Sequence, residues 1–506
     1  MTLLTFIGMI VIPLVASPLV YLSGRLGTHE TTLHRRSFLV RELALLAILL
    51  AWIPFVLSVQ TFLTGGTQEF IIETMWLRVD GISLLAAAMI LTLGTLVILF
   101  SGPYMAGEVG EEKYYAMLLT MIGLMIGLAC AGDLFNLWVW FEGMAISSYL
   151  LVAFYREQAA SLEAGMKYLV QSAIGSVMVL MGIALVLANA GTLDLPGIRE
   201  AVSGSDVNRL AFLGAGALFV IGFGVKVAIV PLHTWLPDAH SQAPSGISAM
   251  LSGVVIEVGL IAMLRALSVL PGFSLSWGIL FMAFGALNML YGNLLALRQT
   301  VVKRMLAYSS LSHIGYILLG LGIALYSSME LGAQGAFFHL FNHMLMKGLA
   351  FLSVGALIFG LFLQNDLHAS LKITDLAGTA QKYPWVALAL SIAVLGLGGL
   401  PPLAGFMSKW QIFVAGFQTQ NIWIIALMVF MALNSVLSLA YYAPLVNMMY
   451  RKSPSLQVLA GKQLSLAIVL PLVVMMFAVI ILGFAPQLMD WVTIPAAKTL
   501  IAMFGK

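Results

Sequence analysis

The sequence predicts an all-α polytopic membrane protein with about fourteen transmembrane helices, arranged as two inverted five-helix repeats with breaks in helices seven and twelve. Of its 506 residues, 61% are hydrophobic and only 9% are charged, and the mean hydropathy is +1.02. A water-soluble domain of this size cannot keep such a composition at its surface. Apolar segments of roughly 20 residues, the length that crosses a bilayer, recur along the chain.

Hydropathy places the expected spans in chain order. The first, residues 3–24, has no positively charged start and no small-residue cleavage site, so we expect a retained helix and not a signal peptide. Residues 488–503 can form a short amphipathic end helix after the last span. The remaining spans are residues 43–63, 80–101, 114–131, 134–154, 162–190, 210–230, 246–270, 275–297, 304–325, 332–361, 384–416, 422–449 and 464–485.

Lysine and arginine are distributed unequally between alternate loops. Fourteen of the 24, Lys303 among them, fall in loops after odd-numbered spans. Four fall in or beside loops after even-numbered spans, namely Arg78, Arg199, Arg209 and Arg265. Cytoplasmic loops carry the excess of basic residues. We therefore expect the odd-numbered loops in the cytoplasm, both termini on the outer side, and the chain in the inner (cytoplasmic) membrane of the cell.

Two spans contain helix breakers in similar company. In GFGVKVAIVPLHTWLPDAH, Lys226 precedes Pro231 by five residues, and in LGLGGLPPLAGFMSKW, Lys409 follows Pro402 by seven. Proline removes a backbone donor and clashes with the preceding turn, so both helices should be discontinuous and leave polar backbone groups free at mid-membrane. Paired breaks in corresponding halves indicate an ion site between inverted repeats. An ordinary proline kink is the alternative.

Matching helix seven to helix twelve makes spans four to eight and nine to thirteen the two inverted units. The chain then divides into four expected segments. These are residues 1–110 with helices one to three, 111–272 with the first repeat, 273–450 with the second repeat, and 451–506 with helix fourteen and the end helix.

Charged side chains also occur inside the apolar spans. A charge at bilayer depth is costly, so such residues usually face a bundle interior or a wet cavity and mark ion pathways. Charges of both signs indicate a path for protons or small cations. Lys167 lies within about two turns of the start of its span, where it can instead snorkel to the cytoplasmic interface. The full set is Lys167, Lys226, Lys347, Lys409, Glu142 and Glu257.

Glu142 and Lys226 are expected to form a pair. The carboxyl lies in DLFNLWVWFEGMAISSYLLV, where few other polar side chains are available. A buried carboxylate needs a cation nearby, and Lys226 is the natural partner. A proton or cation arriving beside the pair weakens its attraction, so the pair can act as a switch. A static ion pair that fixes helix register is the alternative.

A second polar group is expected in FFHLFNHMLMKG, where His339, His343 and Lys347 follow at i, i+4 and i+8 along one helical face. Histidine titrates near neutral pH and can relay protons between lysines. His313 in the preceding span adds a station, and His233 in the broken seventh helix is a secondary candidate. Histidines four residues apart can also bind a metal, but no carboxylate or cysteine ligand accompanies them, so we expect no metal site.

Four motifs, PLHTWLPDAHSQAPSGISAMLSG, KRMLAYSSLSHIGY, FHLFNHMLMKG and LPPLAGFMSKW, together resemble the antiporter-like membrane subunits of respiratory complex I, membrane-bound hydrogenases and Mrp-type cation/proton antiporters. The resemblance covers residues 80–450 and looks closest to the Mrp D-type and related subunits. It implies a fourteen-helix fold with inverted repeats, a glutamate on helix five and a lysine on helix seven, matched by Glu142 and Lys226. It also implies a polar axis at mid-membrane, whose second half is matched by His313, His343, Lys347 and Lys409.

Two positions depart from this pattern. Where the family has a central lysine on helix eight, MLSGVVIEVGLIAML has Glu257. The acid can be a protonatable carboxyl that hands protons on, part of a cation site, or the mark of a subunit that has lost transport. Val301 stands where an acid commonly precedes the Lys-Arg pair.

The expected function is a proton-translocating, non-redox subunit of a multisubunit respiratory membrane complex of the NADH:quinone oxidoreductase or hydrogenase kind. Protons would pass along Lys226, Glu257, His313, His343 and Lys347 to Lys409. Other membrane-arm subunits and the bilayer are the expected partners, and we expect neither a cofactor nor nucleic-acid binding on this chain, which has no glycine-rich phosphate loop and no cysteine cluster. The alternatives are a subunit of an Mrp-type Na+/H+ antiporter without redox partners and a non-pumping structural subunit.

Overall fold

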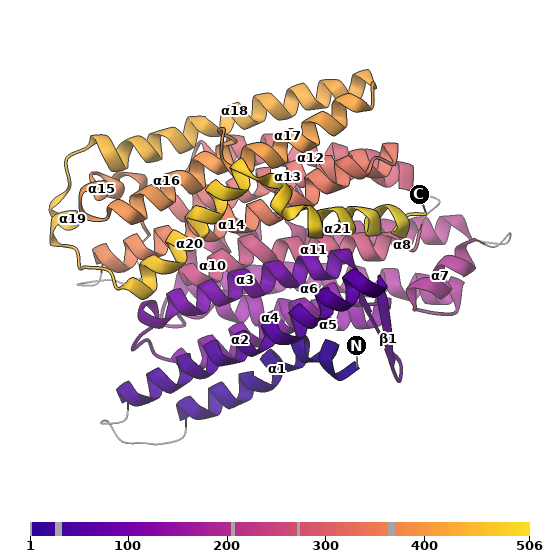
Figure 1. The fold of residues 1–506 in the computed structure, drawn as a ribbon, viewed down its shortest axis with the longest axis horizontal. Coiled ribbons are helices and arrows are strands. Elements are labelled where there is room, and N and C mark those ends of the chain that lie inside the picture. The colour runs from indigo at the N-terminus through magenta and orange to yellow at the C-terminus, as the bar shows by residue number, and fades with distance from the viewer. Residues whose placement is uncertain (1–2, 26–32, 204–207, 271–273, 363–369, 506) are drawn as a thin grey trace.

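The computed structural model describes residues 3–25, 33–203, 208–270, 274–362 and 370–505. Its long helices lie side by side in one bundle and run roughly along a common axis (Figure 1). The start of the first helix and the end of the last helix lie on the same side of the bundle, which also carries a β-hairpin and the short helix α7. The short helices α15 and α19 lie at the opposite end. Chain ends on one side fit an even number of crossings.

The first half of the chain forms the lower and central part of the bundle in Figure 1. Its elements are α1 (Leu3–Arg25), α2 (Leu33–Gly65), β1 (Gln68–Ile72), β2 (Met75–Val79), α3 (Gly81–Tyr104), α4 (Glu111–Ala129), α5 (Leu134–Val152), α6 (Ala159–Ala190), α7 (Leu195–Val202), α8 (Arg209–Val227), α9 (Trp235–Gln242), α10 (Ser245–Met250), the π-helical turn η2 (Leu251–Val255) and α11 (Ile256–Leu267).

The second half completes the bundle. Its elements are α12 (Ser274–Ala296), α13 (Val302–Ser327), α14 (Glu330–Phe362), η4 (Ile373–Leu376), α15 (Thr379–Lys382), α16 (Pro384–Gly398), α17 (Ala404–Gln418), α18 (Ile422–Arg451), α19 (Leu456–Ala460), α20 (Leu466–Phe484), η5 (Pro486–Met489) and α21 (Asp490–Met503). The end helix α21 packs against α3 and α14.

The architecture is the polytopic all-α fold that the composition predicts. Among the described residues, 12 helices are long and apolar enough to cross a membrane. Helix α5 and the pair α16–α17 occupy the two other ranges expected as spans. The hairpin of β1 and β2, an antiparallel pair between α2 and α3, was not expected.

Both expected helix breaks are present. α8 ends where Ala228 takes a left-handed conformation, and Pro231 lies in the segment before α9. α16 ends where Gly399 takes a left-handed conformation, and Pro402 lies just before α17. In both spans the chain leaves the helix before its prolines, because proline cannot donate to the ladder and disfavours a helical residue before it.

The span expected over residues 246–270 has a feature that hydropathy could not reveal. It runs without a gap from α10 through η2 into α11, so that one π-helical turn lies inside it. The described residues of this span are wholly buried. π-helical turns often occur at functional sites.

A buried ion pair joins α3 to α11. Arg265, which was counted among the basic residues in or beside the loops after even-numbered spans, is completely buried in α11. Its guanidinium donates two hydrogen bonds of 3.0 Å to the carboxylate of Asp80 and one of 2.7 Å to the carbonyl oxygen of Ala129. Asp80 also caps α3 by accepting a hydrogen bond from the backbone of Ser83. One carboxylate thus starts a helix and neutralises an arginine inside the bundle.

The Asp80–Arg265 pair should be a major contributor to stability. Replacing Asp80 by alanine leaves a buried, unpaired guanidinium and an uncapped helix, so we expect the free energy of unfolding to fall by about 3–5 kcal/mol. Unfolding in mixed detergent–SDS micelles measures the change. Glu163→Ala is the control, because it breaks a solvent-exposed pair with Lys167 and should cost less than about 1 kcal/mol. Equal losses in the two variants would contradict the assignment.

Candidate functional site

A set of polar side chains lies buried inside the bundle, and we call it the polar axis. It comes from α8, α11, α13, α14 and α17. Such groups need polar partners, since no water surrounds them. The exposed fractions of its members lie between 0% and 6%, and the members are Lys226, Glu257, His313, His343, Lys347 and Lys409.

Lys226 lies in the last turn of α8, just before the break in span seven. Its ammonium donates hydrogen bonds to the hydroxyl of Tyr168, at 2.6 Å, and to the hydroxyl of Ser148, at 3.2 Å. The ring of Tyr168 stacks on Trp235 in α9 with centroids 3.9 Å apart, and the Trp235 indole donates to the carbonyl of Val225 at 2.7 Å. The break therefore brings α9 back to support the partner of the lysine.

Glu142 does not form the expected direct ion pair with Lys226 in this structure. Its side chain is half-buried in α5, and its Oε2 has no hydrogen-bond partner among the described residues. The ammonium of Lys226 instead contacts Ser148, further along the same helix. Two neutral hydroxyls therefore take the place that sequence analysis gave to the carboxylate.

Glu257 contacts a histidine. Its Oε1 lies 2.6 Å from Nδ1 of His343, and both side chains are completely buried. One residue, Ile256, separates Glu257 from the π-helical turn η2. Sequence analysis left the role of this acid open, and the contact was not predicted because the two residues are 86 positions apart.

The contact with His343 continues into a run of histidines. Nδ1 of His313 lies 3.0 Å from Nε2 of His339, and Nδ1 of His339 lies 2.8 Å from the hydroxyl of Ser408. The ring of His313 also stacks on that of His343, with centroids 5.3 Å apart. We call Glu257, His343, His313, His339 and Ser408 the histidine row. It joins α11, α14, α13 and α17 through side-chain contacts alone.

Lys409 lies one residue beyond the end of this row, in the second broken span. Its ammonium donates to the carbonyl of Leu397 at 2.8 Å and to the hydroxyl of Ser435 at 2.9 Å, and it lies 4.3 Å above the ring of Tyr316. Leu397 is in the last turn of α16, where the helix break leaves carbonyl groups without intrahelical donors. The break therefore supplies an acceptor for the lysine that follows it.

Lys347 is buried beside the histidine row but is bound elsewhere. Its ammonium donates to the carbonyl of Leu306 at 2.8 Å and to the hydroxyl of Ser309. The hydroxyl of Tyr442 also contacts Ser309, at 2.7 Å. The lysine shares α14 with His339 and His343, yet no hydrogen bond joins it to them in the described structure.

Helix α11 contacts Lys226 and also carries Glu257, the first member of the histidine row. A side chain at Gly259 would meet the stem of Lys226, whose Cγ is 3.0 Å from the position a Cβ would take. Glu257 precedes Gly259 by two residues in the same helix. The absence of a side chain at Gly259 allows Lys226 to pack against the helix that carries the acid.

Lys167 and His233 lie outside the polar axis. Lys167 is 48% exposed and pairs with Glu163 at 2.7 Å and with Asp238 at 3.0 Å. Asp238 also binds Arg304, at 2.5 Å, so it crosslinks α9 to α6 and α13. His233 is half-buried and faces Tyr308 edge-on.

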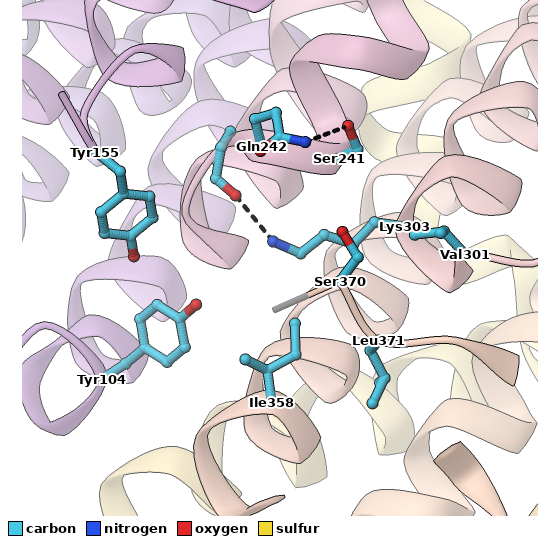
Figure 2. A pocket seen from close by; sticks show the side chains of 10 residues that line it. Tyr104, Tyr155, Ser241, Gln242, Val301, Lys303, Ile358, Ser370 and Leu371 are labelled. Atoms are coloured by element: carbon cyan, nitrogen blue, oxygen red, sulfur yellow. Dashed lines mark hydrogen bonds between the residues drawn. The ribbon is translucent and has the colours of Figure 1, made fainter. Parts of the chain in front are cut away.

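Lys303 is a buried cation that sequence analysis assigned to a loop. The structure puts it in the first turn of α13, where its ammonium donates to the carbonyl of Ala243 at 2.8 Å. Figure 2 shows this lysine across a small cavity from Tyr104 and Tyr155. The cavity has a volume of about 20 Å³, which is enough for one water molecule.

His240, another buried polar residue, was not selected from the sequence. Neither ring nitrogen has a hydrogen-bond partner among the described residues, and the ring stacks on Phe351 with centroids 4.8 Å apart. It closes the motif HTWLPDAH, whose first histidine was the one selected. The signal available was that this polar residue stands five positions before a fully buried span.

The described residues contain no group of three or more histidine, cysteine, aspartate or glutamate side chains arranged to hold a metal ion. Cys130 is buried and unpaired with another cysteine.

Family models match most of the chain. Residues 131–438 match a model described as NADH:quinone oxidoreductase/Mrp antiporter, transmembrane. Residues 72–115 match a model described as NADH-ubiquinone oxidoreductase (complex I), chain 5 N-terminus. The first match contains every member of the polar axis.

Individual relatives cover nearly the whole chain. F420H2 dehydrogenase subunit N of Methanosarcina mazei is 30% identical over 88% of this chain and 90% of its own. NADH-quinone oxidoreductase subunit N of Desulforamulus reducens is 32% identical over 87% of this chain and 89% of its own. A chain of an archaeal membrane-bound sulfane sulfur reductase superimposes with a TM-score of 0.84 at 28% identity, covering 98% of this chain and 97% of that one.

The Glu257–His343 contact can be tested by a double-mutant cycle. We expect Glu257→Gln and His343→Gln to show a coupling free energy of about 1.5–3 kcal/mol in unfolding measurements, because a hydrogen bond involving an ionisable group is lost only once. A cycle of Glu257→Gln with Glu163→Gln is the control and should be additive within about 0.5 kcal/mol. Additivity in the first cycle would show that the contact carries no energy.

Proposed function

The chain belongs to the NADH:quinone oxidoreductase/Mrp antiporter family of membrane subunits, and we propose that it translocates protons within a multisubunit respiratory membrane complex. The complex would be of the NADH:quinone oxidoreductase or hydrogenase kind. In this proposal the chain holds no redox cofactor, and other subunits carry the electrons. The partners of this chain in the proposal are other membrane-arm subunits beside it in the inner membrane. Both termini of the chain would lie on the outer side of that membrane.

The observation that carries the proposal is the histidine row. His339 uses both ring nitrogens, one toward His313 and one toward Ser408. A neutral imidazole has one donor and one acceptor nitrogen, so it can take a proton on one side and release another on the opposite side. The row is hydrogen-bonded from Glu257 to His343 and again from His313 through His339 to Ser408, beside Lys409. Between His343 and His313 there is only ring stacking, and Nε2 of His343 has no hydrogen-bond partner among the described residues, so this step requires a ring rotation or a bridging water molecule.

Glu257 then has a role that a lysine could not fill in the same way. As a carboxyl it accepts a proton and passes it to the imidazole of His343, 2.6 Å away. This supports proton transfer over the reading in which the acid marks a subunit that has lost transport.

Lys226 is proposed as the residue that couples the relay to the rest of the complex. In the structure it is bound to Tyr168 and Ser148, and Glu142 is separate from it. Moving the ammonium from the hydroxyls to Glu142 would remove a positive charge from beside α11. The pair would thus open and close in alternation, and Lys409 would mark the exit. Lys347, bound to Leu306 and Ser309, would set the charge beside the row.

Replacing Lys226 by alanine should lower proton pumping about 100-fold while the complex still assembles, since a positioned proton-transfer group contributes factors of this size. Pumping is measured by quenching of a pH-sensitive dye in inside-out membrane vesicles, driven by the electron donor that the co-purifying subunits identify. Assembly is checked by native gel electrophoresis. The exposed Lys452→Ala is the matched control and should pump normally. Unchanged pumping in Lys226→Ala would rule out the coupling role.

His339→Phe should interrupt the relay, because the ring remains but both nitrogens are lost. We expect pumping to fall by about 100-fold in the same vesicles. Asn434→Leu removes a buried polar group outside the row, on α18, and serves as the control for packing. If complexes that carry His339→Phe pump as fully as those that carry Asn434→Leu, the protons take another route, and this chain would be a non-pumping structural subunit.

An Mrp-type Na+/H+ antiporter module is the second candidate, because the matching family model includes such antiporters. In that case dye quenching would appear on addition of sodium to vesicles that hold only the neighbouring membrane subunits. Quenching that needs an electron donor and ignores sodium would favour the respiratory complex.

A further inference from the structure

We propose that a groove formed by α1, α4 and the end of α5 binds an anionic phospholipid. We call it the lipid groove. The proposal is independent of the proton pathway, because no member of the polar axis lines this groove.

The lipid groove has a volume of about 510 Å³. Its walls come from the last turns of α1, the first turns of α4 and the residues around the end of α5, and these helices pack side by side (Figure 1). Most of the wall is apolar, with Met117, Leu150 and Phe154 among the lining side chains, and Tyr21 stands at its rim. Tyrosine is enriched where a membrane meets water.

The lipid groove also has a charged end. Lys113 and Arg156 line it, and no acidic side chain does. Neither residue forms an ion pair within the described structure. The neighbouring cations are already neutralised, since Arg25 lies 3.5 Å from Glu112 and Arg41 lies 2.6 Å from Glu111. Two positive charges therefore remain for a ligand.

The groove lies where a phospholipid headgroup would be. It is at the end of the bundle that holds the loops after odd-numbered spans, which carry most of the lysine and arginine. The adjoining surface is apolar and exposed, as at Val15, Leu19 and Ile146, so it faces lipid chains. A phosphate bound by Lys113 and Arg156 would place its acyl chains along this surface. Basic pockets between helices on this side of a membrane bind anionic headgroups.

The test is native mass spectrometry of the full chain within its complex, released from nanodiscs of equal parts phosphatidylglycerol and phosphatidylcholine. We expect the wild-type chain to retain phosphatidylglycerol in preference to phosphatidylcholine. The double variant Lys113→Gln with Arg156→Gln should bind it about 25-fold more weakly, since each basic residue near such a headgroup contributes roughly a factor of five.

Two further variants separate charge from shape. Arg451→Gln with Lys452→Gln removes the same charge from exposed positions at the end of α18 and should leave retention unchanged. Met117→Trp fills the apolar wall without changing charge and should lower retention. Equal retention of the two lipids by wild type, an unaffected Lys113/Arg156 variant, equal losses in both charge variants, or full retention by Met117→Trp would each overturn the proposal. None of these outcomes depends on whether the chain pumps protons.

Discussion

Hydrocarbon offers no hydrogen-bond partner, so every charge buried in this bundle must be held by polar atoms of the protein. The structure meets this requirement in three ways. Arg265 has a carboxylate, Lys226 has hydroxyl groups, and Lys347 and Lys409 have a backbone carbonyl together with a serine. The positions of the serines, the tyrosines and the broken helices in the interior follow from these needs.

A consequence is that acids and lysines of the interior are kept apart. Lys226, Lys347 and Lys409 are bound by neutral acceptors, while Glu257 is bound by an imidazole. A lysine on a neutral acceptor has no counter-charge beside it when it is protonated. The field along the polar axis is therefore sensitive to any group that gains or loses a proton there, and a direct lysine–carboxylate pair would remove that sensitivity.

Local signals predicted most of the fold. Hydropathy located the spans, and Pro231 and Pro402 located the breaks, because a proline acts on its own turn. Pairings across the bundle were not predictable in the same way. The partner of Glu257 lies on a helix far along the chain, and the choice of Ser148 over Glu142 for Lys226 depends on which face of α5 turns inward. Lys303 was placed in a loop because the hydropathy window began the span one residue later, although packing buries this charge.

The stacking of three imidazoles has a consequence for the rate of any proton relay along the histidine row. After one passage along the hydrogen-bonded rings of His313 and His339, each of the two holds its hydrogen on the opposite nitrogen, so their donors point backward. A second passage in the same direction requires the rings or their protons to be restored first. His313 is stacked between the rings of His339 and His343, which leaves little space for a ring flip. The return of these hydrogens to their starting nitrogens, and not the proton transfer between neighbouring groups, would then limit the rate of the relay. The packing of α13 against α14 would set how fast the rings can turn.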